Sequence, residues 1–304
     1  METGKASLDE IKRILENNRG VMLKSNIIGS DFSFLKAYSS NIIFKVEPMV
    51  FYNSLSIEEN ALLSVLFPLN DFVTSGTWPS IAMLNFEKPA KAGKDYFEYI
   101  DRVLKILGRR KIKVASGHTG SYGNLDYGVA GSIAFIGFED PIFDFRRIRE
   151  DDLYYSIGAL GNELSYFKDS GKGTHAPSEL SIEIYIREFL RIRKSVHYVH
   201  DLSEGGLNRG LMEVANVTHH GFDVSTAALK TVASKGLKDY GRKLFSVSSS
   251  GALIVSISQT DEEKFERMLN KKSWPSLRIE KKNDGVTLDG KSYDPKDSII
   301  DFLK

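Results

Sequence analysis

The chain has 304 residues, 41% hydrophobic and 27% charged, and its 41 Lys and Arg residues against 40 Asp and Glu residues give a formal net charge of +1. Cysteine is absent, which excludes a disulfide framework, a thiolate metal site and a cysteine nucleophile. The balanced charge gives no overall field for a nucleic-acid backbone or an anionic membrane, so we expect a soluble protein that binds neither.

The first segment predicts a short surface helix. Ser7 and Glu10 form a capping-box pattern ahead of apolar residues with helical spacing, and the helix is expected to end near Gly20. This amino terminus is charged every few residues and lacks the apolar core of a secretory signal, so we expect a cytoplasmic protein. The sequence has no run of about 18 apolar residues of the kind that spans a membrane.

Strands and helices are predicted to alternate through the first half. Runs rich in Ile, Val and Phe predict strands, and runs with helical spacing predict helices. Pro48 predicts a bulge or an edge position in the first strand. The predicted elements are a strand at 41–52, a helix at 56–73, a strand at 80–86, a helix at 95–107, and strands at 111–116 and 131–138. This alternation indicates a mixed α/β layer architecture.

Charges cluster and the apolar periodicity breaks at residues 139–152, which is typical of a boundary between two compact units. We place the division near residue 147, giving domains of residues 1–147 and 148–304. A loop at 168–177 is polar enough to stay at the surface and to order on a ligand. The elements predicted beyond it are a helix at 179–195, a strand at 196–200, a helix from about 204, a strand at 252–257 and a helix at 261–269.

The segment HDLSEGGL, residues 200–207, carries the strongest local signal. It lies where a strand ends and a helix begins, and free backbone N–H groups and the helix dipole favour an anion there. Asp201 or Ser203 can cap the helix, and Gly205 and Gly206 allow a phosphate to approach the backbone. The alternative is a capped helix start in which Gly206 packs tightly, and from spacing alone this alternative is the more common.

Two further segments place polar residues where a ligand could bind. LNDFVTSGTWP, residues 69–79, sets Asp71 in an apolar helical run. A metal, a cation or backbone donors must offset the desolvation of this carboxylate, and a satisfied structural aspartate is the more frequent explanation. The Gly-His-Thr run at 117–119 follows the strand predicted at 111–116, at the end of which open α/β sheets place ligands.

One segment with a well-known spacing is set aside. GVTLDGKS, residues 285–292, fits the spacing of a phosphate-binding P-loop. A P-loop must connect a buried strand to a long helix, whereas here Pro295 follows shortly after the motif. A β-hairpin with a turn at Asp289 and Gly290 explains this segment better.

Taken together, the motifs resemble those of the aminoimidazole ribonucleotide (AIR) synthase-related superfamily. LNDFVTSGTWP is similar to a pattern of that superfamily, and HDLSEGGL looks very like a motif of formylglycinamide ribonucleotide amidotransferase. SGHTGSYGNLDYGVAGSIAFIG is similar to a segment of selenophosphate synthetase. The segments 29–33 and 249–253 resemble the early acidic motif and the late Ser-Gly strand of the superfamily. The superfamily also includes thiamine-monophosphate kinase and a hydrogenase-maturation dehydratase, and the resemblance spans nearly the whole chain.

The resemblance implies an AIR synthase-like fold with two mixed α/β domains. It also implies a homodimeric phosphotransferase or ligase that uses ATP and Mg²⁺ to phosphorylate or activate an oxygen of a small metabolite, with active sites between domains and subunits. The implied magnesium ligands are Asp31, Glu47 and Asp71. The implied nucleotide and phosphate contacts are Asn70, Gly117, His118, Thr119, Ser203, Gly205 and Gly206, and the implied catalytic residues are His200 and Asp201.

The departures from the family pattern leave an alternative open. Ser30 stands where the early motif usually has an acid, and Glu47-Pro48 stands where an aspartate in a freer strand is usual. Metal binding is then weaker, or lost. The absence of cysteine argues against the particular chemistry of selenophosphate synthetase and the hydrogenase-maturation protein. The alternative is a non-catalytic, nucleotide-binding regulatory or assembly subunit of the same fold, and a third possibility is an unrelated two-domain binding protein.

Overall fold

The computed structural model describes residues 13, 16–17, 19–21, 23–27, 30–89, 93–122, 129–169 and 176–293. The helix predicted from Ser7 to Gly20 falls largely outside these residues, as do Gly29 of the early acidic motif and the middle of the predicted polar loop at 168–177. None of the helices within the described ranges is long and apolar enough to cross a bilayer.

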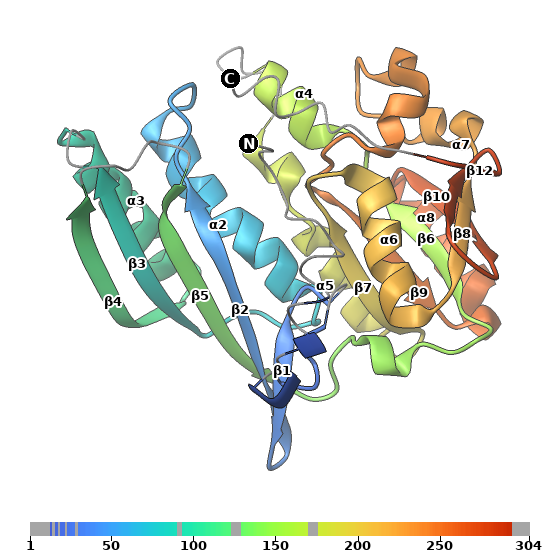
Figure 1. The fold of residues 1–304 in the computed structure, drawn as a ribbon, viewed down its shortest axis with the longest axis horizontal. Coiled ribbons are helices and arrows are strands. Elements are labelled where there is room, and N and C mark those ends of the chain that lie inside the picture. The colour runs from blue at the N-terminus through green and yellow to red at the C-terminus, as the bar shows by residue number, and fades with distance from the viewer. Residues whose placement is uncertain are drawn as a thin grey trace.

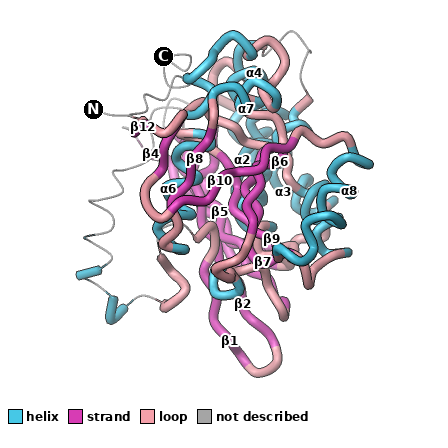
Figure 2. The backbone as a smooth tube through the Cα atoms, turned by 90° about the vertical axis from the view of Figure 1, so that its right-hand side faces the viewer, coloured by secondary structure: helices cyan, strands magenta, loops and turns pink. Residues whose placement is uncertain are grey.

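Within the described residues, the first sheet has five strands in the order β1-β2-β5-β3-β4. Its strands are β1 (Ser33–Ala37), β2 (Ser40–Val50), β3 (Ile81–Pro89), β4 (Lys113–Tyr122) and β5 (Val129–Glu139). Helices α2 (Ile57–Val73) and α3 (Asp95–Arg109) pack on one face of this sheet (Figure 1). The elements predicted in this half are present. β1 is an additional strand that forms a hairpin with β2, and Figures 1 and 2 show this hairpin projecting from the body of the molecule.

Pro48 lies on a stretch of β2 that is paired on one side. Among the described strands, β1 pairs with β2 only from Ser40 to Phe44, whereas β5 pairs with β2 past Pro48. The register then shifts between Met49 and Val50. Because proline has no N–H to donate, such a position tolerates it. The expectation of an edge or a bulge at Pro48 is therefore confirmed.

Strand β4 runs further than the sequence pattern indicates. The predicted strand ends at residue 116, but β4 continues to Tyr122 because it pairs in parallel with β3 as far as Pro89. Gly117, His118 and Thr119 consequently lie within the strand. The prediction that the strand ends at residue 116 is wrong, since the ladder continues through these residues, and their contact with a ligand stays a prediction.

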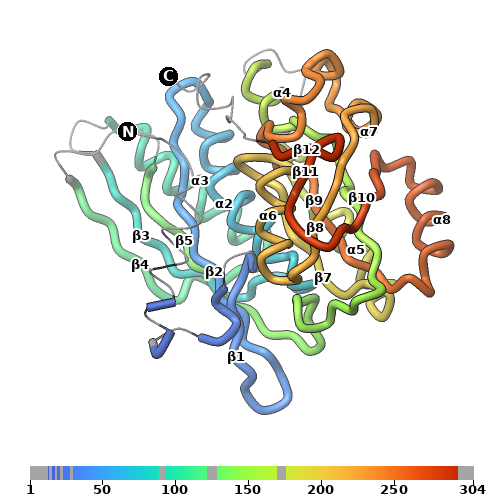
Figure 3. The backbone as a smooth tube through the Cα atoms, turned by 45° about the vertical axis from the view of Figure 1, so that its right-hand side comes forward, coloured from blue at the N-terminus to red at the C-terminus, as the bar shows by residue number. Residues whose placement is uncertain are grey.

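The second sheet, in the part of the chain that the structure describes, has seven strands in the order β12-β11-β8-β10-β6-β9-β7. Its strands are β6 (Leu153–Ile157), β7 (Val196–Leu202), β8 (Gly221–Val224), β9 (Ala252–Ile257), β10 (Ser276–Lys282), β11 (Val286–Leu288) and β12 (Lys291–Ser292). The α-helices of this half are α4 (Asn162–Lys168), α5 (Glu183–Arg191), α6 (Gly206–Thr218), α7 (Thr226–Thr231) and α8 (Glu262–Lys272). Figures 1 and 3 show α6 in front of the strands of this sheet.

Both faces of the second sheet are covered, which explains why β9 is apolar at nearly every position. Side chains alternate along a strand. Ile254 joins an apolar cluster that includes Leu211 of α6, and Val255 joins another cluster that includes Phe189 of α5 and Phe265 of α8. The strand predicted at 252–257 is therefore the buried centre of this half.

The helix predicted at 179–195 is shorter than expected. A 3₁₀ turn covers Pro177–Leu180, Ser181 is extended, and α5 begins only at Glu183. The side-chain amide of Asn70 donates to the carbonyl oxygen of Leu180 at 2.7 Å, and its oxygen accepts the N–H of Ile182 at 3.2 Å. The backbone groups that would continue the helix are thus bonded to α2, and the prediction of one long helix is wrong.

The predicted hairpin near the end of the chain is confirmed. β11 and β12 pair antiparallel, with Leu288 opposite Lys291. Asp289 and Gly290 have φ values of 54° and 72°, as a two-residue turn between antiparallel strands requires. The residues that mimic a P-loop therefore lead into a second short strand and not into a helix.

One apolar cluster takes residues from both halves of the chain. It includes Phe72 of α2 and Phe135 of β5, together with Phe189 and Phe265 of the second half. The first sheet ends at Glu139 and the second begins at Leu153. The division near residue 147 falls in this connection, and two separate domains stay a prediction.

Candidate functional site

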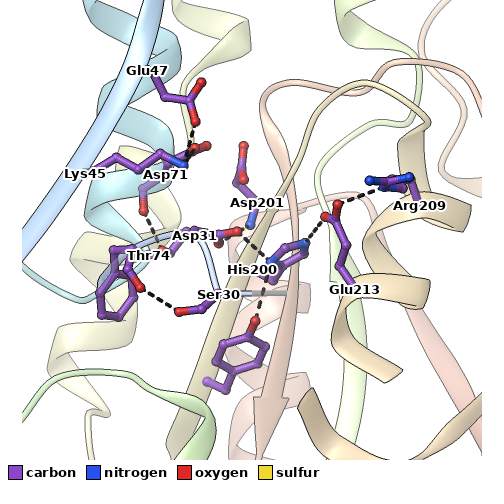
Figure 4. A network of polar contacts seen from close by, with 12 residues as sticks. Ser30, Asp31, Lys45, Glu47, Asp71, Thr74, His200, Asp201, Arg209 and Glu213 are labelled. Atoms are coloured by element: carbon purple, nitrogen blue, oxygen red, sulfur yellow. Dashed lines mark hydrogen bonds and ion pairs between the residues drawn. The ribbon is translucent and has the colours of Figure 1, made fainter. Parts of the chain in front are cut away.

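Two networks of charged side chains meet where the first sheet approaches β7 (Figure 4). We call Lys45, Glu47 and Asp71 the lysine network, and Asp31, His200, Glu213 and Arg209 the histidine network. Lys45 and Asp31 both contribute to the wall of one cavity, so the two networks are neighbours.

In the lysine network, two carboxylates converge on one ammonium group. Lys45 and Glu47 are two residues apart on β2 and share a face of the strand. The Nζ of Lys45 lies 2.7 Å from Oε1 of Glu47 and also pairs with Asp71, near the end of α2. Burial lowers the pKa of Lys45, but Asp71 and Glu47 outweigh burial and raise it above its usual value. The ammonium is therefore charged and supplies the cation that an acid in an apolar helix needs.

Water still reaches this network. The side chains of Lys45 and Asp71 are 15% and 16% exposed, and that of Glu47 is 34% exposed. Burial raises the pKa of Glu47, Lys45 lowers it, and Asp71 raises it again. Glu47 and Asp71 thus repel one another and are held together by the charge between them. The position between them is suited to a cation and is open to exchange with solvent.

In the histidine network, one buried imidazole bridges two acids. His200, on β7, is 3% exposed. Its Nδ1 lies 2.7 Å from Oδ1 of Asp31, and its Nε2 lies 3.1 Å from Oε2 of Glu213 on α6. Burial alone lowers the pKa of His200, but Asp31 and then Glu213 raise it to about 10. Both ring nitrogens therefore carry protons, and His200 is an imidazolium that donates to both carboxylates.

The histidine network extends to the HDLSEGGL turn and along α6. The second oxygen of Asp31 accepts the backbone N–H of Asp201 at 3.0 Å. At the other end, the Nε of Arg209 donates to Oε1 of Glu213 at 2.8 Å. Asp31 thus holds the end of β7 through the side chain of His200 and through the backbone N–H of Asp201. Acidic and basic side chains alternate along the network.

A cavity of about 290 Å³ lies against the face of the first sheet that α2 and α3 do not cover. This volume is near the lower limit of about 300–1,000 Å³ for small-molecule pockets. Side chains alternate along β2, so Phe44 and Val46 face this cavity while Lys45 points to α2. Lys45 also borders the cavity, but its ammonium pairs with Asp71 on the other face of β2. A second cavity, of about 450 Å³, is lined by residues of β6 and β10 and includes no residue of either network.

The structure brings together two of the three implied metal ligands. Glu47 and Asp71 share Lys45, whereas both oxygens of Asp31 are engaged by His200 and the N–H of Asp201. In the part of the chain that the structure describes, no group of three or more His, Asp or Glu side chains is arranged to hold a metal.

Of the implied phosphate contacts in the HDLSEGGL turn, Gly206 has a structural task. Gly205 and Gly206 have φ values of 79° and 54°. A Cβ on Gly206 would lie 2.2 Å from the carbonyl oxygen of Val247, so tight packing accounts for this glycine. The N–H of Gly206 donates to the carbonyl oxygen of Ser203 at 3.0 Å. The packing alternative therefore fits Gly206, while Gly205 is the residue directly before α6.

The remaining implied contacts are not gathered with the networks. Asn70 is fully engaged with the backbone of the segment before α5. Gly117, His118 and Thr119 are exposed on β4, which β3 and β5 separate from β2 in the sheet order. Within one copy of the chain, these residues do not share a site with Lys45.

Sequence reasoning did not single out Lys45, Arg209 or Glu213 as site residues. The sequence does contain a spacing pattern for each of these residues. Lys45 and Glu47 have the spacing that places two side chains on one face of a strand, and Arg209 and Glu213 have the four-residue spacing of a helical ion pair. Their connection to Asp71 and His200 is a tertiary contact that no local pattern encodes.

No protein-family model matches the sequence, and a search of curated proteins gives no match. Solved structures do match. A chain of the HypE–HypF complex has a TM-score of 0.71 at 14% identity, covering 94% of this chain and 99% of that one. Thiamine-monophosphate kinase from Stenotrophomonas maltophilia has a TM-score of 0.66 at 17% identity, covering 94% and 96%. A ThiL structure with AMPPCP and TMP has a TM-score of 0.69 at 17% identity, covering 97% and 98%.

These likenesses extend over nearly the whole chain and show its fold. The prediction of a mixed α/β, AIR synthase-like fold is confirmed.

Proposed function

We propose that this chain binds ATP with Mg²⁺ and phosphorylates or activates an oxygen of a small metabolite. The observation that carries the proposal is the convergence of Glu47 and Asp71 on a single, partly exposed cation position. The fold shared with a structure that contains AMPPCP, a non-hydrolysable ATP analogue, supports it. Carboxylate oxygens are the donors that Mg²⁺ prefers, and Mg²⁺ usually binds one or two of them together with phosphate oxygens and water.

In this proposal Glu47 and Asp71 hold Mg²⁺, which would neutralise charge on the phosphates as the phosphoryl group transfers. Lys45, which pairs with both acids, adds a further positive charge to the site. Asp31, which the resemblance implies as a third ligand, is assigned instead to hold His200 and the N–H of Asp201. Catalysis is then positional and electrostatic, and no covalent enzyme intermediate is required.

We assign His200 and Asp201 to positioning. His200 is enclosed by two acids and is out of reach of a substrate, so it acts by fixing the end of β7. The backbone of Ser203 and Gly205 precedes α6, whose dipole favours an anion at this end. We therefore keep these two residues as proposed phosphate contacts, whereas Gly206 is explained by packing.

The test is ADP release over a panel of phosphorylatable metabolites with Mg²⁺, together with thermal unfolding in MgATP. We expect MgATP to raise the melting temperature and one class of metabolite to release ADP. Asp71→Asn should lose both effects. A chain whose melting temperature does not respond to MgATP contradicts the proposal. Binding without turnover supports the regulatory alternative, which Ser30 favours because its hydroxyl donates to the carbonyl oxygen of Phe32 and supplies no charge.

We also propose a homodimer that forms through the face of the first sheet opposite α2 and α3. Val46 and Phe138 are 63% and 51% exposed on this face. Val46 and Met83 flank Ala134 of β5, so the apolar side chains are contiguous across three strands. A patch of this kind on a sheet face indicates an interaction site, and a two-fold dimer buries the same patch on both copies.

The proposed dimer also bears on the three implied ligand contacts of β4. Gly117, His118 and Thr119 are exposed at the edge of the same sheet. In this proposal they lie near the edge of the interface between the two copies, and they are too far along the sheet to reach the lysine network of their own copy.

A further inference from the structure

The ammonium of Lys45 stands at the position that the proposed function requires for a divalent cation. Its Nζ is 2.7 Å from Glu47 and is paired with Asp71 as well. Mg²⁺ binds carboxylate oxygens at about 2.0–2.1 Å in a compact octahedron. An ammonium group and a metal ion therefore exclude one another from the space between these two acids.

We propose that Lys45 is a built-in counter-ion that closes the Glu47–Asp71 pair to divalent metal and gives way only when a nucleotide brings the metal in. This inference rests on the proposed function and adds an order of binding to it. The geometry supports it, because Lys45 reaches both acids from the strand that also carries Glu47.

The chemistry of lysine suits this task. Lysine carries a compact charge on a flexible four-carbon stem, so it can leave one anion for another at little steric cost. The phosphates of a nucleotide offer Lys45 a new anionic partner when the metal binds Glu47 and Asp71. A free metal ion offers no such partner, and it must displace the ammonium into water without compensation. Metal affinity without nucleotide is therefore low in the wild-type chain.

The experiment measures Mn²⁺ binding without nucleotide, by the electron paramagnetic resonance signal of free Mn²⁺. Lys45→Met removes the charge and keeps most of the stem, and we expect it to bind Mn²⁺ at least tenfold more tightly than the wild-type chain. Lys45→Arg keeps a cation between the acids and should bind like the wild type. Lys36→Met is the matched control, because it removes a lysine paired at 2.8 Å with Asp140 and leaves the lysine network intact.

Adding Glu47→Gln to Lys45→Met should abolish the gain, which assigns the new metal site to the acid pair. Equal Mn²⁺ affinity of Lys45→Met and the wild type, within twofold, overturns the proposal. A second measurement uses only the wild-type chain and so does not depend on a variant that folds. Mn²⁺ should raise the melting temperature of the wild type much more with AMPPCP present than without it. Equal shifts in a chain that binds AMPPCP also overturn the proposal.

The two proposals fail differently. If AMPPCP does not bind the wild type, the proposed function falls while the Mn²⁺ titration of Lys45→Met still decides the role of Lys45. If AMPPCP binds and Lys45→Met does not change Mn²⁺ affinity, the counter-ion role falls and the proposed function stands.

Discussion

The Nδ1 atom of His200 lies 2.7 Å from Oδ1 of Asp31, and this contact ties the segment before β1 to strand β7 of the other sheet. The same carboxylate accepts the N–H of Asp201 at 3.0 Å. One side chain therefore fixes both the imidazole and the next peptide group, directly before the turn into α6. The position of that turn depends on a residue far away in the sequence.

Removing the Asp31 carboxylate should destabilise the protein strongly. Asp31→Asn leaves a buried imidazolium short of a partner, and breaking one side of a buried pair costs about 3–5 kcal/mol. Urea unfolding monitored by tryptophan fluorescence measures this loss. Asp140→Asn is the control, since Asp140 pairs with Lys36 at the surface and such pairs contribute about 0–1 kcal/mol. Similar losses in both variants would show that the Asp31–His200 contact contributes little.

Stability should fall in alkaline solution because of His200. Its pKa rises from 6.5 to about 10 on folding, so its contribution is complete below pH 6.5 and is lost as pH rises toward 10. We expect the free energy of unfolding to decline across this range in the wild type and to be flatter in His200→Gln. Parallel pH profiles for the two chains contradict the charged state assigned to His200.

Metal-dependent nucleotide binding should depend on Asp71 and not on the P-loop lookalike. Asp71→Asn keeps the size of the side chain and removes a charge that would hold Mg²⁺, so it should abolish most MgATP binding. Lys291→Ala should leave binding unchanged, because Lys291 lies in an exposed two-residue strand. Calorimetric titration of both variants with MgATP measures this. The opposite result would refute the assignment of the site.

Two glycines with positive φ allow the stability cost of tight packing to be measured apart from the cost of backbone conformation. Gly206→Ala places a methyl group 2.2 Å from the carbonyl oxygen of Val247, whereas Gly290→Ala meets nothing within 4 Å. Left-handed backbone costs each variant about 1–2 kcal/mol. Overpacking should cost Gly206→Ala about a further 1–3 kcal/mol. Thermal unfolding compares them, and equal losses would argue against tight packing at Gly206.

A charge on the face of the first sheet opposite α2 and α3 should separate the proposed dimer. Val46→Glu and Phe138→Glu each place a carboxylate in the apolar patch, and we expect monomers by light scattering at concentrations where the wild type is dimeric. Leu104→Glu is the control, since Leu104 is 42% exposed on α3, away from this face. A monomeric wild type over a wide concentration range contradicts the dimer outright.

Elements with strong local patterns were predictable from the sequence. α2 begins where Ser56 and Glu59 form a capping box, with the hydroxyl of Ser56 accepting the N–H of Glu59 at 3.2 Å. β9 has the bounds that its apolar run predicts. The length of α5 was not predictable, because Asn70 captures the backbone of Leu180 from 110 residues away. Local periodicity contains no trace of such a contact.

The candidate site was predictable in part for the same reason. Asp71 stood out as an acid in an apolar helix, and its need for a metal, a cation or backbone donors was evident. Only the tertiary structure shows that Lys45, on a neighbouring strand, supplies the cation. Asp31 and His200 each stood out within a motif, but their contact joins separate sheets and depends on the complete fold.

The apolar cluster shared by both halves constrains how the chain folds during synthesis. Leu69 and Phe72 of α2 belong to the same cluster as Phe189 of α5 and Val199 of β7. A domain with its own core can fold as it leaves the ribosome. Here the inner surface of α2 finds its last neighbours only after residue 199 has been made, so a nascent chain that ends earlier exposes apolar surface. A stalled or cleaved first half should therefore aggregate or bind a chaperone.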